Sequence, residues 1–295
     1  MTVCFYFGGI WMRIGYQGVA GSYSEATLQD YIKTLTDTTT EIVPVPYGDF
    51  KSVVNDLLDD KLDLIVVPVE NSTTGIISRV TDLLRYKPVM AIAEAYQPVR
   101  HTLWGVQGSR LEDIQMVYSH PEALSQCQVF FNSYPLIESK VYEDTAKAAS
   151  YIQTLNRRDI AAIASPRAGE LHHLVPLMEN VQDESTNTTR FYVIEKIQER
   201  EYTGTCLSLY VETRHESGAL SKLLQVFDIF NCNLQNLSAR PIENQPFTYG
   251  FFIEVSIKEM SSPVNILIQT LDQVSEYLQI MGQYDQVSKS IYLDV

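Results

Sequence analysis

Two stretches of the sequence alternate short apolar strands with helices, and this alternation restricts the chain to an α/β architecture more than any other feature does. The first stretch ends in a continuous apolar run at residues 64–69, which is typical of a strand covered on both faces. The order strand, helix, strand, helix, strand predicts a parallel sheet. Its elements are expected at residues 13–18, 22–36, 41–46, 50–58 and 64–69.

A second series of the same kind begins near residue 88. Extended segments are predicted at residues 89–96, 102–106, 115–119, 136–142 and 160–164, one helix at Pro121, and another at 144–155 that Asp144 caps. Residues 12–200 are therefore expected to form one domain of two lobes, with the second lobe at about 88–180. A ligand cleft is expected between the lobes, because ligands gather beyond the carboxyl ends of such strands.

A third unit, residues 204–295, follows a charged linker at 199–204. Strands are predicted at 206–212, 234–241, 248–257 and 287–293, and helices at 218–230 and 263–281, the second with Ser262 as its cap. The order βαββαβ is the ferredoxin-like arrangement. Units of this size commonly bind or regulate, although fold alone establishes neither role.

Composition excludes several classes of partner. The 295 residues are 45% hydrophobic and carry a formal net charge of −14, which would repel nucleic acid and anionic lipid. Small molecules and other proteins are therefore the expected partners. The sequence contains no apolar run long enough to span a membrane, and residues 1–11 lack the basic region of a signal peptide.

Metal-binding patterns are also missing from the sequence. The neighbouring His172 and His173 would point in different directions on a helix, so we expect no metal and no cofactor. The cysteines form no C-x-x-C pair, which favours a reducing cytoplasm. They are Cys4, Cys127, Cys206 and Cys232.

Four polar segments follow or enter the strands of the first two lobes. In residues 15–25 a glycine turn leads into a helix whose first turn carries Ser22 and Ser24, where an anion could sit. The alternative is a capped turn that needs glycine only for its backbone angles. In residues 68–75, Asn71 and Ser72 follow a buried strand and are expected to face the cleft, or else only to cap the next helix.

The other two segments place a hydroxyl at the start of a predicted helix and a cation at the start of an apolar strand. Residues 119–126 put Ser119 at the mouth of a helix, with Gln126 nearly two turns further along. Residues 187–194 carry Arg190 into an otherwise apolar strand, where a guanidinium is costly unless it meets an anion.

All four segments resemble the prephenate dehydratase and arogenate dehydratase family, and the resemblance extends from Arg13 to the C-terminus. Its most specific parts are the triplet Thr189-Arg190-Phe191, the turn Glu70-Asn71-Ser72 and the Ser-His-Pro sequence at Ser119. The resemblance implies a catalytic part with the two-lobed fold of type-II periplasmic binding proteins and a C-terminal phenylalanine-sensing ACT domain. It also implies a cytoplasmic carbon–oxygen lyase that acts in phenylalanine biosynthesis.

The resemblance further implies the residues of the site. Thr189 occupies the position of the family's essential threonine, and Asn71, Ser119 and Gln126 match positions credited with catalysis. The reaction expels a ring hydroxide together with a carboxylate, so we expect Thr189 to donate a hydrogen bond or proton to the hydroxide, and catalysis to rest mainly on orientation and fixed dipoles. Arg190 is expected to hold the side-chain carboxylate of the substrate. Further substrate-binding residues are expected to be Phe191, Glu70, Ser72, Ser22, Tyr23 and Thr145.

Two of these residues have structural alternatives. A Glu70 carboxylate would repel a dianionic substrate, which favours a structural role in which Glu70 holds Asn71. Thr145 could equally be the capped start of a helix.

The C-terminal unit resembles the family's regulatory part at two places. The residues expected to sense phenylalanine, the effector, are Gly218, Ala219, Leu220, Asn233 and Leu234. Ser238 and Ala239 depart from the family pattern, which has Glu-Ser before Arg-Pro, and this departure removes an acidic group. Regulation through paired ACT domains implies a homodimer or homotetramer.

Two other functions remain open from the sequence. The chain could act on arogenate, which carries an ammonium group where prephenate has a keto group. It could also be a non-catalytic protein that senses an amino acid.

Overall fold

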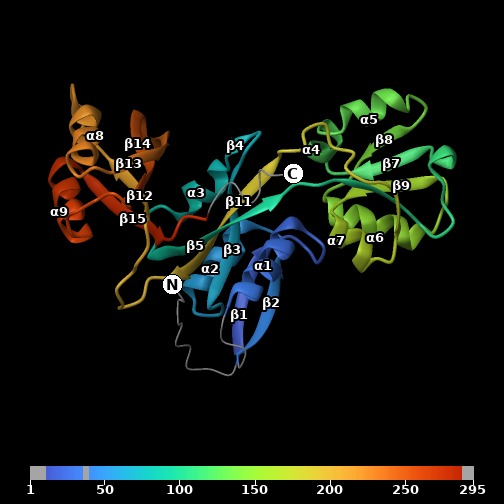
Figure 1. Cartoon of the computed structure of the whole chain (residues 1–295), viewed down its shortest axis with the longest axis horizontal. Coiled ribbons are helices and arrows are strands. Elements are labelled where there is room, and N and C mark those ends of the chain that lie inside the picture. Colours follow the sequence, from blue (N-terminus) through green and yellow to red (C-terminus); the bar gives the residue numbers. More distant parts are fainter. Residues whose placement is uncertain (1–10, 36–39, 288–295) are drawn as a thin grey trace. The chain divides into compact units, whose positions relative to one another are not determined.

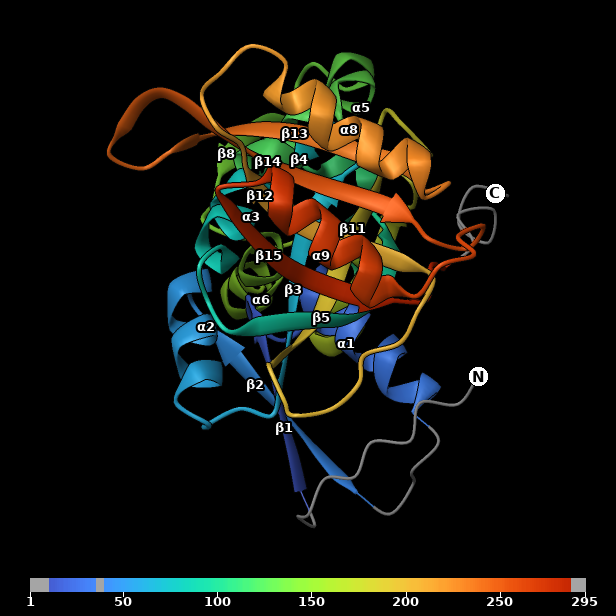
Figure 2. The same ribbon diagram turned by 90° about the vertical axis from the view of Figure 1, so that its left-hand side faces the viewer.

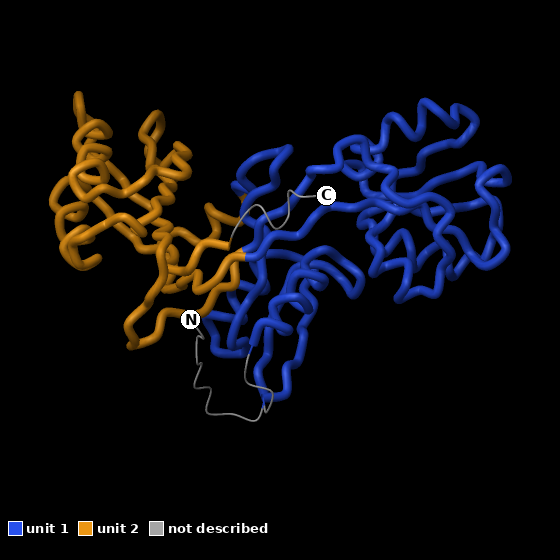
Figure 3. Tube along the Cα trace, viewed as in Figure 1, with its two compact units in different colours: residues 1–78, 95–191, 289–295 blue, residues 79–94, 192–288 orange. Residues whose placement is uncertain are grey.

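The computed structural model describes residues 11–35 and 40–287 (Figure 1). The described residues divide into two compact units, of which the first comprises residues 11–35, 40–78 and 95–191 and the second residues 79–94 and 192–287 (Figure 3). Within the described residues, no helix is long and apolar enough to cross a membrane.

The first lobe of unit 1 is built on a parallel sheet, as the sequence predicts. Strand β1 lies between β2 and β3 and pairs in parallel with both. Ser22 and Asp49 cap the two helices by accepting backbone N–H groups. The elements are β1 (Trp11–Gln17), α1 (Tyr23–Thr34), β2 (Glu41–Tyr47), α2 (Phe50–Leu58), β3 (Leu64–Asn71) and the short β4 (Gly75–Ile76), which pairs with β3.

The second lobe is a five-stranded sheet in the order β10-β6-β9-β7-β8 with helices on both faces (Figure 1). Alternate residues of the central strand serve the two faces: Ala162 and Ala164 pack on the side of α6 and α7, while Ala161 and Ile163 pack on the side of α4 and α5. The elements are β6 (Thr102–Gly105), η1 (Leu111–Asp113), β7 (Met116–Ser119), α4 (Pro121–Ser125), α5 (Gln128–Ser133), β8 (Glu138–Val141), α6 (Thr145–Leu155), β9 (Ile160–Ala164), α7 (Pro166–Leu171) and β10 (Val175–Met178).

Unit 2 contains the predicted βαββαβ arrangement. Its antiparallel strands follow the order β13-β14-β12-β15, and α8 and α9 lie side by side on one face of the sheet (Figure 2). Its elements are β12 (Cys206–Glu212), α8 (Ala219–Ile229), β13 (Asn233–Ile242), β14 (Gln245–Ser256), α9 (Val264–Val274) and β15 (Tyr277–Tyr284). Three further elements cross the boundaries between the units: α3 (Ser78–Leu84), β5 (Val89–Pro98) and β11 (Thr188–Lys196).

The end of unit 2 corrects the prediction from sequence. The helix predicted at 263–281 stops at Val274, and the closing strand is β15 rather than residues 287–293. Val287 lies outside any strand, and residues 288–293 lie outside the described residues. The reason is the spacing of the residues that pack on the core: Leu267 and Leu271 are four apart, as on a helix, whereas Leu278 and Ile280 are two apart. Ser262 is not the cap, because the cap position is Pro263 and no side chain caps this helix.

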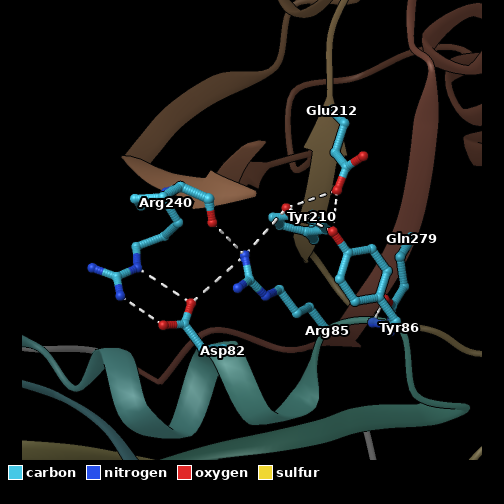
Figure 4. A network of polar contacts seen from close by, with 8 residues as sticks. Asp82, Arg85, Tyr86, Tyr210, Glu212, Arg240 and Gln279 are labelled. Atoms are coloured by element: carbon cyan, nitrogen blue, oxygen red, sulfur yellow. Dashed lines mark hydrogen bonds and ion pairs between the residues drawn. The ribbon is translucent and has the colours of Figure 1, made fainter. Parts of the chain in front are cut away.

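A network of charged and phenolic side chains joins α3 and the residues after it to the ferredoxin-like sheet within unit 2 (Figure 4). Arg240 on β13 makes a bidentate pair with Asp82 at 2.6 and 3.2 Å. The Arg85 guanidinium donates to the Pro241 carbonyl at 3.0 Å. Glu212 accepts from the hydroxyl groups of Tyr86 and Tyr210.

Candidate active site

A cavity of about 640 Å³ lies in unit 1 between the two lobes. It is lined from the first lobe by the turn after β3, from the second lobe by α4, and by the segment that leads into β11. Gln126 is the one predicted catalytic residue among its lining residues. They are Thr73, Thr74, His120, Pro121, Glu122, Ser125, Gln126, Gln182, Asp183, Glu184 and Asn187.

Asn71 lies at the carboxyl end of β3 and is held on both sides of its amide. Its Oδ1 accepts from the backbone N–H groups of Thr73 and Thr74, at 3.0 and 3.1 Å. Its Nδ2 donates to Asn187 Oδ1 at 2.7 Å and to Thr189 Oγ1 at 3.0 Å. Asn71 thus joins the turn after β3 to the predicted catalytic threonine, and it does not cap α3.

Two buried residues that the sequence did not single out extend this contact to α4. Gln126 Oε1 accepts from Asn187 Nδ2 at 3.1 Å and lies 3.2 Å from His101 Nε2. His101 Nδ1 lies 3.1 Å from the Tyr23 hydroxyl, which donates to the Arg100 carbonyl at 2.6 Å. The structure therefore brings Tyr23, Gln126, Asn71 and Thr189 into one network, connected by Asn187 and His101.

Burial fixes the charge state of His101. Its side chain is 2% exposed, and desolvation lowers its pKa to about 4, although the hydrogen bond with Gln126 acts in the opposite direction. At neutral pH the imidazole is therefore uncharged, and the network from Tyr23 to Thr189 carries no ionised group.

Arg190 lies beside Thr189 but pairs with a residue of its own lobe. Its Nη1 donates to Glu70 Oε2 at 3.3 Å, and its guanidinium lies over the Tyr96 ring, 6.0 Å from the centroid. Arg190 is 7% exposed, so a carboxylate partner offsets the cost of burying its charge. Glu70 therefore contacts Arg190, which corrects the expectation that it holds Asn71.

Several predicted site residues lie outside the cavity lining. Ser119 is fully buried, and its hydroxyl donates to the Ile163 carbonyl at 2.6 Å. Phe191 is 1% exposed. Ser22 caps α1, Thr145 begins α6 behind the Asp144 cap, and Ser72 Oγ accepts from the backbone N–H of Thr188 at 3.0 Å.

The two lobes are also joined by an ion pair that the sequence did not reveal. Arg167 on α7 makes a bidentate pair with Glu25 on α1, with both distances 2.7 Å. The hydrogen bond from Arg167 is the main cause that lowers the pKa of the Glu25 carboxyl. Glu25 also accepts from the backbone N–H of Gly21, and Ser165 donates to the Gly21 carbonyl. The glycine turn is therefore part of the contact between the lobes.

The cavity wall bears carboxylates and an imidazole. Glu122, Asp183 and Glu184 line it, and among the described lining residues there is no lysine or arginine. His120 lies on the same wall, where its Nδ1 accepts from the backbone N–H of Glu122 at 3.3 Å. This imidazole adds a candidate proton donor or acceptor to the fixed dipoles that the sequence led us to expect.

In unit 2 the predicted effector residues fall into two separate groups. Gly218 is the left-handed N-cap of α8, with φ 81°, and the helix begins with Ala219 and Leu220. These residues follow the carboxyl end of β12. Asn233 pairs with Ser256, which pairs with Cys206 at the amino end of β12. Asn233 and Leu234 therefore lie at the opposite end of the sheet from Gly218.

Two α/β lobes around a polar cavity, followed by a ferredoxin-like unit, define a two-lobed ligand-binding class of protein, and comparison with known proteins specifies the family. Residues 14–199 match the protein-family model for prephenate dehydratase. Arogenate dehydratase 1 of Petunia hybrida is 31% identical over 292 residues, covering 94% of this chain and 67% of the relative. This chain belongs to the prephenate dehydratase family.

Solved structures agree with the expected fold class. The prephenate dehydratase of Staphylococcus aureus subsp. aureus Mu50 is 26% identical, with a TM-score of 0.78 over 92% of this chain and 100% of that one. GqqA, described as a novel type of quorum quenching acylase, is also 26% identical, with a TM-score of 0.82 over 95% of this chain and 99% of that one. The mixed α/β architecture is thus shared along almost the whole chain.

Proposed function

We propose that the chain catalyses the decarboxylating dehydration of prephenate to phenylpyruvate, as a lyase of phenylalanine biosynthesis in the cytoplasm. The observation that carries this proposal is the hydrogen bond from Asn71 to Thr189 Oγ1, at a site inside the region that matches the family. This bond supplies an oriented hydroxyl beside a guanidinium, which is what the departing hydroxide and the retained carboxylate of the substrate require.

The roles of the individual residues follow from their contacts. Thr189 donates to the leaving hydroxide. The side-chain amide of Asn71 orients the Thr189 hydroxyl, and the amide of Gln126 supports Asn71 through Asn187. Arg190 binds the side-chain carboxylate of the substrate once that group displaces Glu70, whose carboxyl is about one-third exposed and can turn to solvent. Because the hydroxyl of Ser119 is buried against a carbonyl, Ser119 supports β9 and does not touch the substrate.

Arogenate is a second candidate substrate. The carboxylates of Glu122, Asp183 and Glu184 on the cavity wall would attract an ammonium group, which arogenate has and prephenate lacks. The similarity to an enzyme named arogenate dehydratase points the same way.

An acylase activity, by contrast, has no support at this cavity. An acylase that used a serine nucleophile would need a base beside the serine, whereas the cavity serine, Ser125, donates to the Glu122 carbonyl.

Residues 204–295 are proposed to be an ACT domain that senses phenylalanine, and residues 12–200, which precede it in the sequence, to be the catalytic domain. A phenylalanine site that used both Gly218 and Asn233 could not form within one chain, because these residues lie at opposite ends of the sheet. This favours a homodimer or a homotetramer in which two such units meet. Phenylalanine binding would then alter the catalytic lobes through the connecting strands.

Parallel assays with both substrates test the proposal. The purified chain is incubated with prephenate, with phenylpyruvate followed by its ultraviolet absorbance, and with arogenate, with phenylalanine followed by chromatography. Turnover of prephenate with the higher kcat/KM supports the first candidate, and a higher value with arogenate supports the second. Turnover of neither substrate, together with calorimetric binding of an amino acid, would support the non-catalytic sensor instead.

A further inference from the structure

The hydrogen-bond network at the site has a direction, by which we mean that each side chain has a fixed donor and a fixed acceptor. Backbone N–H groups set this direction at Asn71. Asn71 Oδ1 faces the N–H groups of Thr73 and Thr74, which can only donate. Oxygen and nitrogen of this amide therefore cannot be exchanged without placing donors against donors. The two hydrogens on Asn71 Nδ2 then point to Asn187 Oδ1 and Thr189 Oγ1.

The orientation of Asn71 also determines which atoms of Asn187 and His101 donate and accept. Because Asn187 Oδ1 accepts from Asn71, the Asn187 Nδ2 group is the one that faces Gln126, and it donates to Gln126 Oε1. Gln126 Oε1 also faces His101 Nε2, so the single ring hydrogen of a neutral His101 lies on Nε2. The Tyr23 hydroxyl gives its one hydrogen to the Arg100 carbonyl, so His101 Nδ1, which lies 3.1 Å from the Tyr23 oxygen, takes no hydrogen bond from it.

The direction decides what Thr189 can do. Its Oγ1 accepts from Asn71, so one lone pair of the hydroxyl oxygen is occupied and the hydroxyl hydrogen remains available for donation. If the Asn71 amide turned over, its oxygen would accept that hydrogen and the donor would be lost. A chain of such bonds also polarises its members, which strengthens the terminal donor.

We propose that Asn187 is a positioning residue: its Oδ1 takes the second hydrogen of Asn71 Nδ2 and holds that amide in the orientation set by the backbone, so that Thr189 is a donor to the substrate. Gln126 and His101 hold Asn187 in turn. Asn187 is 2% exposed and bonds to both Asn71 and Gln126, two residues from opposite lobes. Asn187 acts on the Thr189 hydroxyl through Asn71. The inference rests on the proposed dehydratase function and adds Asn187 to the residues that serve it.

The first test is a double-mutant cycle between Asn187 and Thr189. Asn187→Leu keeps the size of the side chain and removes both hydrogen bonds. It should lower kcat about 100-fold and change KM by less than about 3-fold, because it misplaces a donor that acts in the transition state. In a Thr189→Ala background the same substitution should lower kcat by less than about 2-fold. Asn132→Leu, on the exposed face of α5, is the matched control and should leave kcat unchanged.

A second pair of variants keeps the test decisive if Asn187→Leu does not fold. His101→Gln retains one donor and one acceptor, whereas His101→Leu retains neither, so the glutamine variant should keep at least about 10-fold more kcat. Equal loss of kcat in both His101 variants would overturn the inference. The inference would also be overturned if Asn187→Leu lowered kcat by the same factor in the wild type and in the Thr189→Ala background.

The direction of the network can also be measured in the absence of substrate. In protein labelled with ¹⁵N at histidine, the ring nitrogen shifts of His101 should show one neutral tautomer with its hydrogen on Nε2. A hydrogen on Nδ1 would contradict the inference. Failure of the wild-type chain to convert prephenate or arogenate would count against the proposed function, while the ring shifts would still decide the direction of the network.

Discussion

The two polar networks of this chain are built from opposite kinds of side chain. The network at the candidate site consists of amides, hydroxyls and one neutral imidazole, and its central members, Asn187 and His101, are each 2% exposed. The network of unit 2 uses two arginines, two carboxylates and two phenols, and its bidentate pair of Arg240 and Asp82 keeps more than a quarter of each side chain exposed (Figure 4).

The difference follows from the cost of burying charge. Desolvation keeps His101 neutral, with its pKa lowered to about 4, whereas the carboxylate of Asp82 raises the pKa of Arg240. An uncharged network can lie in a dry site and fix the orientation of a donor without repelling a dianion. A charged network near the surface holds α3 to a sheet, but salt and water weaken it.

Removal of the donor at the end of the uncharged network should have the largest effect. Thr189→Ala is expected to lower kcat about 1000-fold with little change in KM, because the lost interaction forms in the transition state. Thr189→Ser keeps the hydroxyl and should retain most of the rate. Steady-state kinetics with prephenate measures both variants, and a fall in kcat/KM that comes from KM alone would contradict the role of Thr189.

Acid should weaken the uncharged network by protonating His101. Between about pH 6.5 and pH 4 the unfolded chain binds a proton at His101 that the folded chain does not, so the free energy of unfolding falls as the pH falls, by about 3 kcal/mol in total. In His101→Gln this contribution should disappear. Urea titrations at several pH values measure it, and an equal pH dependence in the variant and the wild type would refute the buried neutral imidazole.

The guanidinium next to Thr189 should affect binding more than rate. Arg190→Lys keeps the charge but loses the planar fork, and we expect KM to rise about 10-fold with a smaller fall in kcat. Glu70→Gln is the matched variant, because it removes the ion that competes for Arg190, and it should lower KM. A KM for Arg190→Lys equal to that of the wild type would indicate that the substrate carboxylate binds elsewhere.

Loss of a charge in unit 2 should have the smallest effect. Asp82→Asn should lower the free energy of unfolding by less than about 1 kcal/mol, since the pair is partly exposed. Without phenylalanine, kcat should stay within about 2-fold of the wild type, while the phenylalanine inhibition proposed above should weaken. Thermal unfolding and inhibition curves measure these effects, and a large fall in kcat would mean that this network belongs to the catalytic machinery.

The two regions also differ in how far the sequence predicted them. Apolar alternation predicted the parallel sheet of the first lobe and the βαββαβ sequence of elements in unit 2, because each pattern directly reflects which faces are buried. It failed after Val274, where no glycine or proline separates the end of α9 from β15.

The residues of the site were predicted less completely than the fold. The family resemblance named Asn71, Gln126 and Thr189 as site residues, and the structure joins them in one network. Asn187 and His101 were not named, because they form their bonds with residues distant in sequence. A usable signal was present: Arg100 and His101 lead into the apolar strand β6, just as Arg190 enters β11. Polar residues at the entrance to a buried strand need partners, and here those partners form the site.

The dependence of kcat on pH tests most directly whether an uncharged, oriented hydroxyl drives the reaction. With prephenate at saturation, log kcat should be flat between about pH 6 and pH 9, because no member of the network from Tyr23 to Thr189 changes charge there. A kcat that changes with pH across this range in the wild type and becomes flat in His120→Asn would instead assign proton transfer to the imidazole on the cavity wall.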